Sequence, residues 1–134
     1  MKICRRMLLP VFALVLATGI IANAQTEVAG EITTTTWASS GSPYRVIGTI
    51  TIPTGHTLTI LPGVDVVFDA DVPVIVQGAI SAIGTSQDSI TFLPNDTSNT
   101  EWGGMRVSGG GVSSFAYTQI SGANATGSAP DDRG

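Results

Sequence analysis

The side chains able to carry chemistry in this chain are mostly acidic, and they stand between short β-type runs. The candidates are six acids and two arginines: Asp65, Asp69, Asp71, Asp88, Asp96, Glu101, Arg45 and Arg106. Asp69 and Asp71 occupy one corner, so their carboxylates can share a hard cation such as Ca²⁺ through oxygen ligands. Charged corner residues also keep sheet edges soluble and unpaired, which is a structural interpretation of the same acids. We predict no cofactor, with Asp69 and Asp71 as the candidates if Ca²⁺ binds.

No residues form a recognisable catalytic group. His56 is the only histidine and follows Gly55 in a corner, and a single histidine makes neither a metal site nor a catalytic triad. The adjacent acids Asp131 and Asp132 stand in a polar, glycine-rich tail. A pair of acids at the separation that hydrolysis needs cannot be placed from a sequence alone. We therefore expect no catalytic activity from this chain itself.

A repeat between Gly48 and Phe92 is the scaffold that must position these side chains. Apolar pairs separated by one residue begin every 8 positions, at Ile50/Ile52, Leu58/Ile60, Val66/Phe68 and Val74/Val76. The fourth pair therefore repeats the first at an offset of 24 positions. The same offset places Val66/Phe68 on Ile90/Phe92, and it fits the middle run less well, with Leu58 on Ala82.

Three short strands in about 24 residues are typical of one coil of a parallel β-helix, which buries its apolar side on its neighbours. Alternation at period 2 points the paired residues inward and the residues between them outward. The corners at Pro53-Thr54-Gly55 and Leu61-Pro62-Gly63 place proline before glycine. Proline sets φ in a tight turn and glycine permits a positive φ. The sequence therefore predicts an all-β chain with parallel neighbours.

A polar segment at Asn95 to Glu101 interrupts the pattern. The step from Val74 to Met105 is longer than the repeat offset, and the excess equals the length of this segment. We therefore expect one inserted loop, after which Met105 and Val107 face inward again. Loops on a rigid scaffold are common binding sites. The predicted binding residues are Asn95, Asp96, Asn99, Glu101 and Trp102.

Two aromatic residues before the repeat have two interpretations. Trp37 and Tyr44 are the large side chains of the lead-in segment. They can cap the open end of a stack of coils, or they can form an aromatic platform for a sugar.

The amino-terminal segment from Met1 to Ala24 has the pattern of a cleavable export signal. Lys2, Arg5 and Arg6 give a positive start, the run from Met7 to Ile21 is apolar, and Ala22-Asn23-Ala24 has small residues at a cleavage site. The apolar run is shorter than the ~20 residues that span a bilayer. We expect no stable membrane insertion after cleavage, and a secreted or cell-surface protein.

Removal of this signal changes the charge. Of 134 residues, 110 remain, with all 10 acids and only three arginines, so the net charge is −7. No lysine or cysteine remains. Without a basic patch to neutralise phosphates, nucleic acid is excluded as a partner, and disulfides cannot stabilise the mature chain.

Several runs resemble secreted bacterial right-handed parallel β-helix proteins of the pectin-lyase-like superfamily. They are TLTILPGVDVVFDA, GAISAIGTSQDSITF, WGGM and FAYTQISGA, within about residues 32–123. The resemblance implies an all-β, right-handed parallel β-helix, and the 110 residues of the mature chain correspond to about three to four coils. It also implies acidic Ca²⁺ ligands with an Arg or Lys base in the lyases, and clustered Asp with His and Arg motifs in the hydrolases. An Asp pair flanked by the His and Arg motifs of the hydrolases is missing from this sequence. Such proteins are usually longer, so we expect a fragment or a truncated member.

The resulting domain prediction is a signal peptide at 1–24, a lead-in and cap at 25–47, coils at 48–120, and a flexible or truncated tail at 121–134. The predicted function is a non-catalytic, exported β-helix module with a structural, adhesive or glycan-binding role. Its expected partners are polysaccharides or cell-surface glycans, and open sheet edges allow self-association. The alternative is the N-terminal part of a polysaccharide lyase or glycoside hydrolase whose active site lies beyond Gly134.

Overall fold

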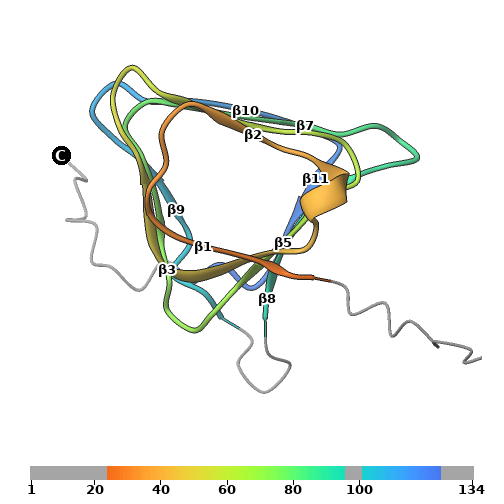
Figure 1. The fold of residues 1–134 in the computed structure, drawn as a ribbon. Helices are drawn as coiled ribbons and strands as arrows, with labels where there is room; N and C mark the ends of the chain where they lie inside the picture. The colour runs from red at the N-terminus through yellow and green to blue at the C-terminus, as the bar shows by residue number, and fades with distance from the viewer. Residues whose placement is uncertain (1–23, 96–100, 125–134) are drawn as a thin grey trace, which may run out of the picture.

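The computed structural model describes residues 24–95 and 101–124 and is built almost wholly of β-strands (Figure 1). The strands are β1 (Thr26–Glu31), β2 (Thr35–Trp37), β3 (Tyr44–Ile52), β4 (Thr57–Ile60), β5 (Asp65–Phe68), β6 (Val74–Val76), β7 (Ala79–Ile83), β8 (Ile90–Pro94), β9 (Met105–Val107), β10 (Val112–Ala116) and β11 (Thr118–Ile120). One short 3₁₀ turn, η1 (Ser39–Gly41), precedes β3.

The strands form two sheets, each made of parallel strands, that curl around a shared interior (Figure 1). The seven-stranded sheet has the order β11-β8-β5-β3-β6-β9, with β1 also paired to β3, and the four-stranded sheet has the order β10-β7-β4-β2. The long strand β3 pairs with β5 through its first half and with β6 through its second half. The chain is thus all-β with parallel strands in curled sheets, an arrangement compatible with a β-helix.

Alternation of apolar and polar residues explains which side of each strand is buried. In β3 to β7 the buried residues recur at every second position near the strand centres, as the period of a strand requires. The buried residues form one cluster: Trp37, Tyr44, Val46, Ile50, Ile52, Leu58, Ile60, Val64, Val66, Phe68, Val72, Val74, Val76, Ile80, Ala82, Ile90, Phe92 and Trp102. The inward apolar pairs predicted from the repeat are therefore confirmed.

Aromatic rings stack inside this core. Phe68 lies with its ring centroid 4.0 Å from that of Trp102 and 6.1 Å from that of Phe92. Trp37 and Tyr44 stack on each other at 4.6 Å, with their planes 8° apart, and both are buried. Their faces pack in the interior, which favours the capping interpretation over a surface platform for sugars.

The expected register is confirmed at two places. Ile50 lies opposite Val74, as the repeat offset predicted. Val74 lies opposite Met105, as the same offset lengthened by the polar segment predicted. The strand pairing therefore resumes after the segment between β8 and β9, with Met105 packed against the core.

The expected constant offset is wrong at two other places. Leu58 lies opposite Ile80 and not opposite Ala82, so the step is two positions shorter than predicted. Val66 lies opposite Phe92 and not opposite Ile90, so the step is two positions longer. The corners explain the change, because the chain from Ala82 to Phe92 is longer than the chain from Ile60 to Val66. The hydrogen bonds of a parallel ladder fix which residues lie opposite each other, whereas a longer corner can bulge outward without breaking these bonds.

The two predicted glycine corners are confirmed. Gly55 has φ 83° and Gly63 has φ 77°, a conformation that costs L-residues energy because of their Cβ atom. Both corners therefore turn where the Pro-x-Gly and Pro-Gly patterns indicated.

The last strands leave apolar side chains at the surface. Phe115 lies opposite the buried Ala82, and Ile120 lies opposite the buried Phe92. Both are nevertheless exposed, as is Val107, at 38%, 44% and 46% respectively. Val107 was expected to face inward, and it does lie opposite the buried Val76. It is nevertheless exposed, because no strand in the described chain pairs with the outer edge of β9.

The lead-in segment joins the sheets directly, since β1 pairs with β3 and β2 pairs with β4. Ala123, at the start of the predicted tail, bridges to Trp102. The predicted signal peptide (apart from Ala24) and the tail from residue 125 lie outside the described residues. In the part of the chain that the structure describes, no helix is long and apolar enough to cross a membrane.

Candidate ligand-binding pocket

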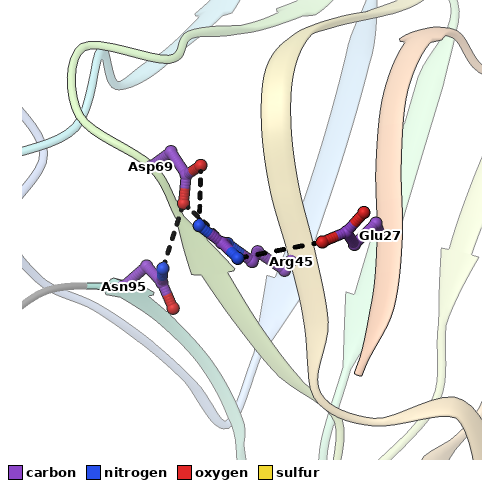
Figure 2. A network of polar contacts seen from close by, with 4 residues as sticks. All are labelled: Glu27, Arg45, Asp69 and Asn95. Carbon is purple, nitrogen blue, oxygen red and sulfur yellow. Dashed lines mark hydrogen bonds and ion pairs between the residues drawn. The ribbon is translucent and has the colours of Figure 1, made fainter. Parts of the chain in front are cut away.

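Four polar side chains from neighbouring strands form one network on the outside of the seven-stranded sheet (Figure 2). Glu27 comes from β1 and Arg45 from β3, while Asp69 and Asn95 directly follow β5 and β8. Backbone bonds continue the ladder beyond these two strands. The Asp69 N–H donates to the Val46 carbonyl at 3.0 Å, and the Asn95 N–H donates to the Phe68 carbonyl at 2.7 Å. The sheet itself therefore places the four side chains in a row.

Asp69 is the centre of this network (Figure 2). Arg45 donates to both of its carboxylate oxygens, from Nε to Oδ1 at 2.9 Å and from Nη2 to Oδ2 at 3.1 Å. Asn95 donates from Nδ2 to Oδ1 at 3.0 Å. On the other side of Arg45, Nη1 lies 3.8 Å from Glu27 Oε1. Two parallel bonds to one carboxylate fix both the position and the plane of the guanidinium.

The network holds Arg45 in its charged form. The hydrogen bond to Asp69 raises the pKa of Arg45 above its ordinary value. The negative charges of Asp69 and Glu27 raise this pKa further, and together these effects outweigh desolvation, which lowers it. A guanidinium is already protonated at physiological pH. Arg45 is therefore a fixed cation and hydrogen-bond donor, and it is unsuited to act as a base.

A pocket of about 370 Å³ opens beside this network. Its polar wall is made by Arg45, Asp69 and Asn95, and its apolar wall includes Ile47 and Val72. Ile47 is 44% exposed, whereas Val72 belongs to the core. A concave site with apolar walls and a few oriented polar groups is the usual form of a small-ligand site.

The structure brings only part of the predicted binding group to this pocket. Asn95 lines it, whereas Asp96 and Asn99 lie outside the described residues. Glu101 is exposed and accepts a hydrogen bond from the side chain of Asn124. Trp102 is fully buried, and its Nε1 donates to the Ser121 carbonyl at 2.8 Å. Its ring therefore packs in the core and presents no face to the surface.

The two candidate Ca²⁺ ligands are placed differently. Both Asp69 oxygens already accept hydrogen bonds from Arg45. Asp71 is exposed in the next corner, at φ 58°. Within residues 24–95 and 101–124, no three His, Cys, Asp or Glu side chains gather as metal ligands would. Arg45 on the neighbouring strand is therefore the positive partner that the structure gives to Asp69.

Three of the remaining polar candidates make contacts at corners. His56 Nδ1 accepts from the Thr34 N–H at 3.2 Å, and Asp65 accepts from the Thr91 hydroxyl. Asp88 accepts from the Thr85 N–H through its backbone carbonyl. These contacts join neighbouring segments and account for polar residues at the corners.

Sequence reasoning named Arg45 and Asp69 separately but missed their pairing, and it missed Ile47. The step from Arg45 to Asp69 equals the step from Ile50 to Val74 in the repeat, and opposite charges at that spacing indicate a contact between adjacent strands. The register places Val67 opposite Arg45, so Arg45 reaches Asp69 diagonally.

Comparisons with protein-family models, with curated proteins and with solved structures found no match to this chain.

Proposed function

We propose that the curled sheets are part of a right-handed parallel β-helix exported from the cell. Parallel pairing of successive passes of the chain supports the winding, and the amino-terminal sequence pattern supports export. Cysteine pairs at outward partner positions test the stacking of successive passes of the chain, at two places in the seven-stranded sheet and one in the four-stranded sheet: Thr51/Ile75, Val67/Leu93 and Thr59/Ser81. Facing positions on adjacent strands suit disulfide geometry. All three pairs should cross-link under mild oxidation, and the mismatched Thr59/Ile83 pair should not.

The function that we propose is non-catalytic binding of a glycan in the pocket beside Asp69. The observation that carries it is the arrangement of Arg45, Asp69 and Asn95 around a concave surface that also exposes Ile47. Sugars present hydroxyl groups together with apolar C–H faces, and this pocket offers partners for both. Because the donors and acceptors are held by each other and by the sheet, little ordering is needed on binding, which favours affinity.

The same contacts argue against catalysis at this place. A general base must take up a proton near neutral pH, whereas the bond to Asp69 keeps Arg45 protonated. Asp69 in turn is held by two bonds from Arg45 and one from Asn95. These contacts fix the three side chains in position, which suits ligand binding.

Binding and turnover assays on the same sample test this proposal. The mature chain is applied to a glycan array, and a polysaccharide panel is followed for new reducing ends and for the absorbance of unsaturated uronates. We expect binding without turnover. Clear turnover would support the alternative of a polysaccharide-degrading enzyme and would refute the non-catalytic function.

A further inference from the structure

The charges in and beside the pocket restrict which sugars can enter it. Asp69 and Arg45 line the pocket and neutralise each other. Glu27 lies beside Arg45 and outside the pocket lining, so the three charges together sum to −1. The guanidinium is neutralised by Asp69 at 2.9 Å and lies 3.8 Å from Glu27. The whole chain is also acidic, with a net charge of −4. An anionic ligand therefore finds no unbalanced positive charge here.

The unused hydrogen-bonding groups suit neighbouring hydroxyls. Arg45 has five N–H groups, of which Nε and one on Nη2 donate to Asp69. The Asn95 amide donates to Asp69 through Nδ2, which leaves its carbonyl oxygen able to accept. A hydroxyl group donates once and accepts from others. Two adjacent hydroxyls can therefore accept from Arg45 and donate to Asn95 or to the carboxylate of Asp69.

The apolar wall and the volume of the pocket also suit a sugar. Ile47 and Val72 line the pocket beside these polar groups, and they offer a surface for the C–H face of a sugar ring. The volume of about 370 Å³ is near the lower end of the roughly 300–1,000 Å³ found for ligand pockets. This suits a single sugar unit of a glycan better than a long stretch of chain.

We propose that this pocket binds a sugar unit without negative charge through two adjacent hydroxyl groups and discriminates against uronic acids. The inference rests on the proposed glycan-binding function and adds the chemical class of the ligand. Amino sugars are tolerated on the same reasoning, because Arg45 is neutralised by Asp69 and the nearby Glu27 adds a negative charge.

Calorimetric titration at low salt with three tetrasaccharides tests the inference: cellotetraose, chitosan tetraose and tetragalacturonate. We expect cellotetraose to bind at least about tenfold more tightly than tetragalacturonate, a difference that corresponds to about 1.4 kcal/mol. Chitosan tetraose should bind at least as tightly as cellotetraose. Tighter or equal binding of tetragalacturonate, or a tenfold loss with chitosan tetraose, would overturn the inference and leave glycan binding standing. Failure of all three ligands, and of the array, would refute the proposed function as well.

Variants locate the site. Asn95→Ala removes one hydrogen-bonding group and should weaken cellotetraose binding about five- to tenfold. The control Ser114→Ala changes an exposed residue of the four-stranded sheet and should bind as the wild type does. The double variant Glu27→Gln/Asp69→Asn turns the local charge from −1 to +1 and should gain affinity for tetragalacturonate. Unchanged affinities in both pocket variants, with circular dichroism confirming that they fold, would show that the sugar binds elsewhere.

Discussion

Replacement of Trp102 separates a core role from a role in ligand binding. The indole is fully buried, stacks on Phe68 at 4.0 Å, and donates a 2.8 Å hydrogen bond to the Ser121 carbonyl. Trp102→Phe keeps an aromatic ring but loses that hydrogen bond, which contributes about 1 kcal/mol. The smaller ring also loses roughly one or two carbon groups of burial at about 0.8 kcal/mol each. We therefore expect the variant to lose about 2 kcal/mol in its free energy of unfolding.

Trp102→Ala extends the same reasoning to the whole ring. Truncation of a buried aromatic residue costs about 3–5 kcal/mol, which is a large part of the roughly 5–15 kcal/mol that stabilises a typical domain. Thermal unfolding followed by circular dichroism measures both variants. For a domain of this size, each kcal/mol lowers Tm by about 4–8 °C. The phenylalanine variant should therefore melt about 8–16 °C below the wild type.

Ligand binding by Trp102→Phe supplies the second measurement. Since the indole has no exposed surface, the folded variant should bind a glycan with unchanged affinity. Stability within about 0.5 kcal/mol of the wild type, as for ordinary surface substitutions, would refute the core placement. A folded variant that loses glycan affinity would instead support the role that the sequence predicted for Trp102.

Four further outcomes test other parts of the structure. Arg45 has a raised pKa in the folded protein, so its contribution is complete below its unfolded pKa and is lost only as the pH rises through the higher folded value. Arg45→Met should therefore lower the urea midpoint equally at pH 7 and pH 9, and a loss that disappears at pH 9 would contradict this. Addition of Ca²⁺ should leave Tm unchanged, because Arg45 already pairs with Asp69, and a clear rise in Tm would restore the cation site. Gly78→Ala should lower the urea midpoint more than Gly55→Ala, since its Cβ would clash with the backbone carbonyl oxygens of Pro53 and His56, whereas a Cβ at Gly55 meets open space and costs about 1–2 kcal/mol for the φ of 83°. We propose self-association through the apolar edge that includes Phe115. Phe115→Lys should lower the mass measured by light scattering, and a wild type that stays monomeric at high concentration would rule this out.

The strands were predictable because their signal is local. Ile50 and Ile52 alternate with outward residues, and Gly55 and Gly63 mark corners that need a positive φ. These features depend on a few adjacent residues, and each has a direct geometric cause. The pairing of Ile50 with Val74 was also predictable, since equal spacing of like residues aligned these two segments.

The register elsewhere was not predictable from one average offset. Leu58 pairs with Ile80, earlier than the average offset predicts, and Val66 pairs with Phe92, later than it predicts. The reason is that the corners vary in length, while the hydrogen bonds between strands keep buried residues opposite each other. The environment of individual side chains was not predictable from their neighbours in the sequence either. Trp102 stands beside a polar segment in the sequence, yet its ring packs on Phe68, which is far away along the chain.

By itself, the amino-acid sequence determined an all-β chain, its parallel neighbours and the inward apolar pairs of the repeat, because these follow from a period of two and from corner chemistry. The candidate site was decided only by the tertiary structure. Arg45, Asp69 and Asn95 belong to three separate strands or their ends, and the parallel ladder brings them within hydrogen-bonding distance. A contact of this kind depends on strand register and on corner length together, and a local pattern records neither with enough accuracy to place a side chain.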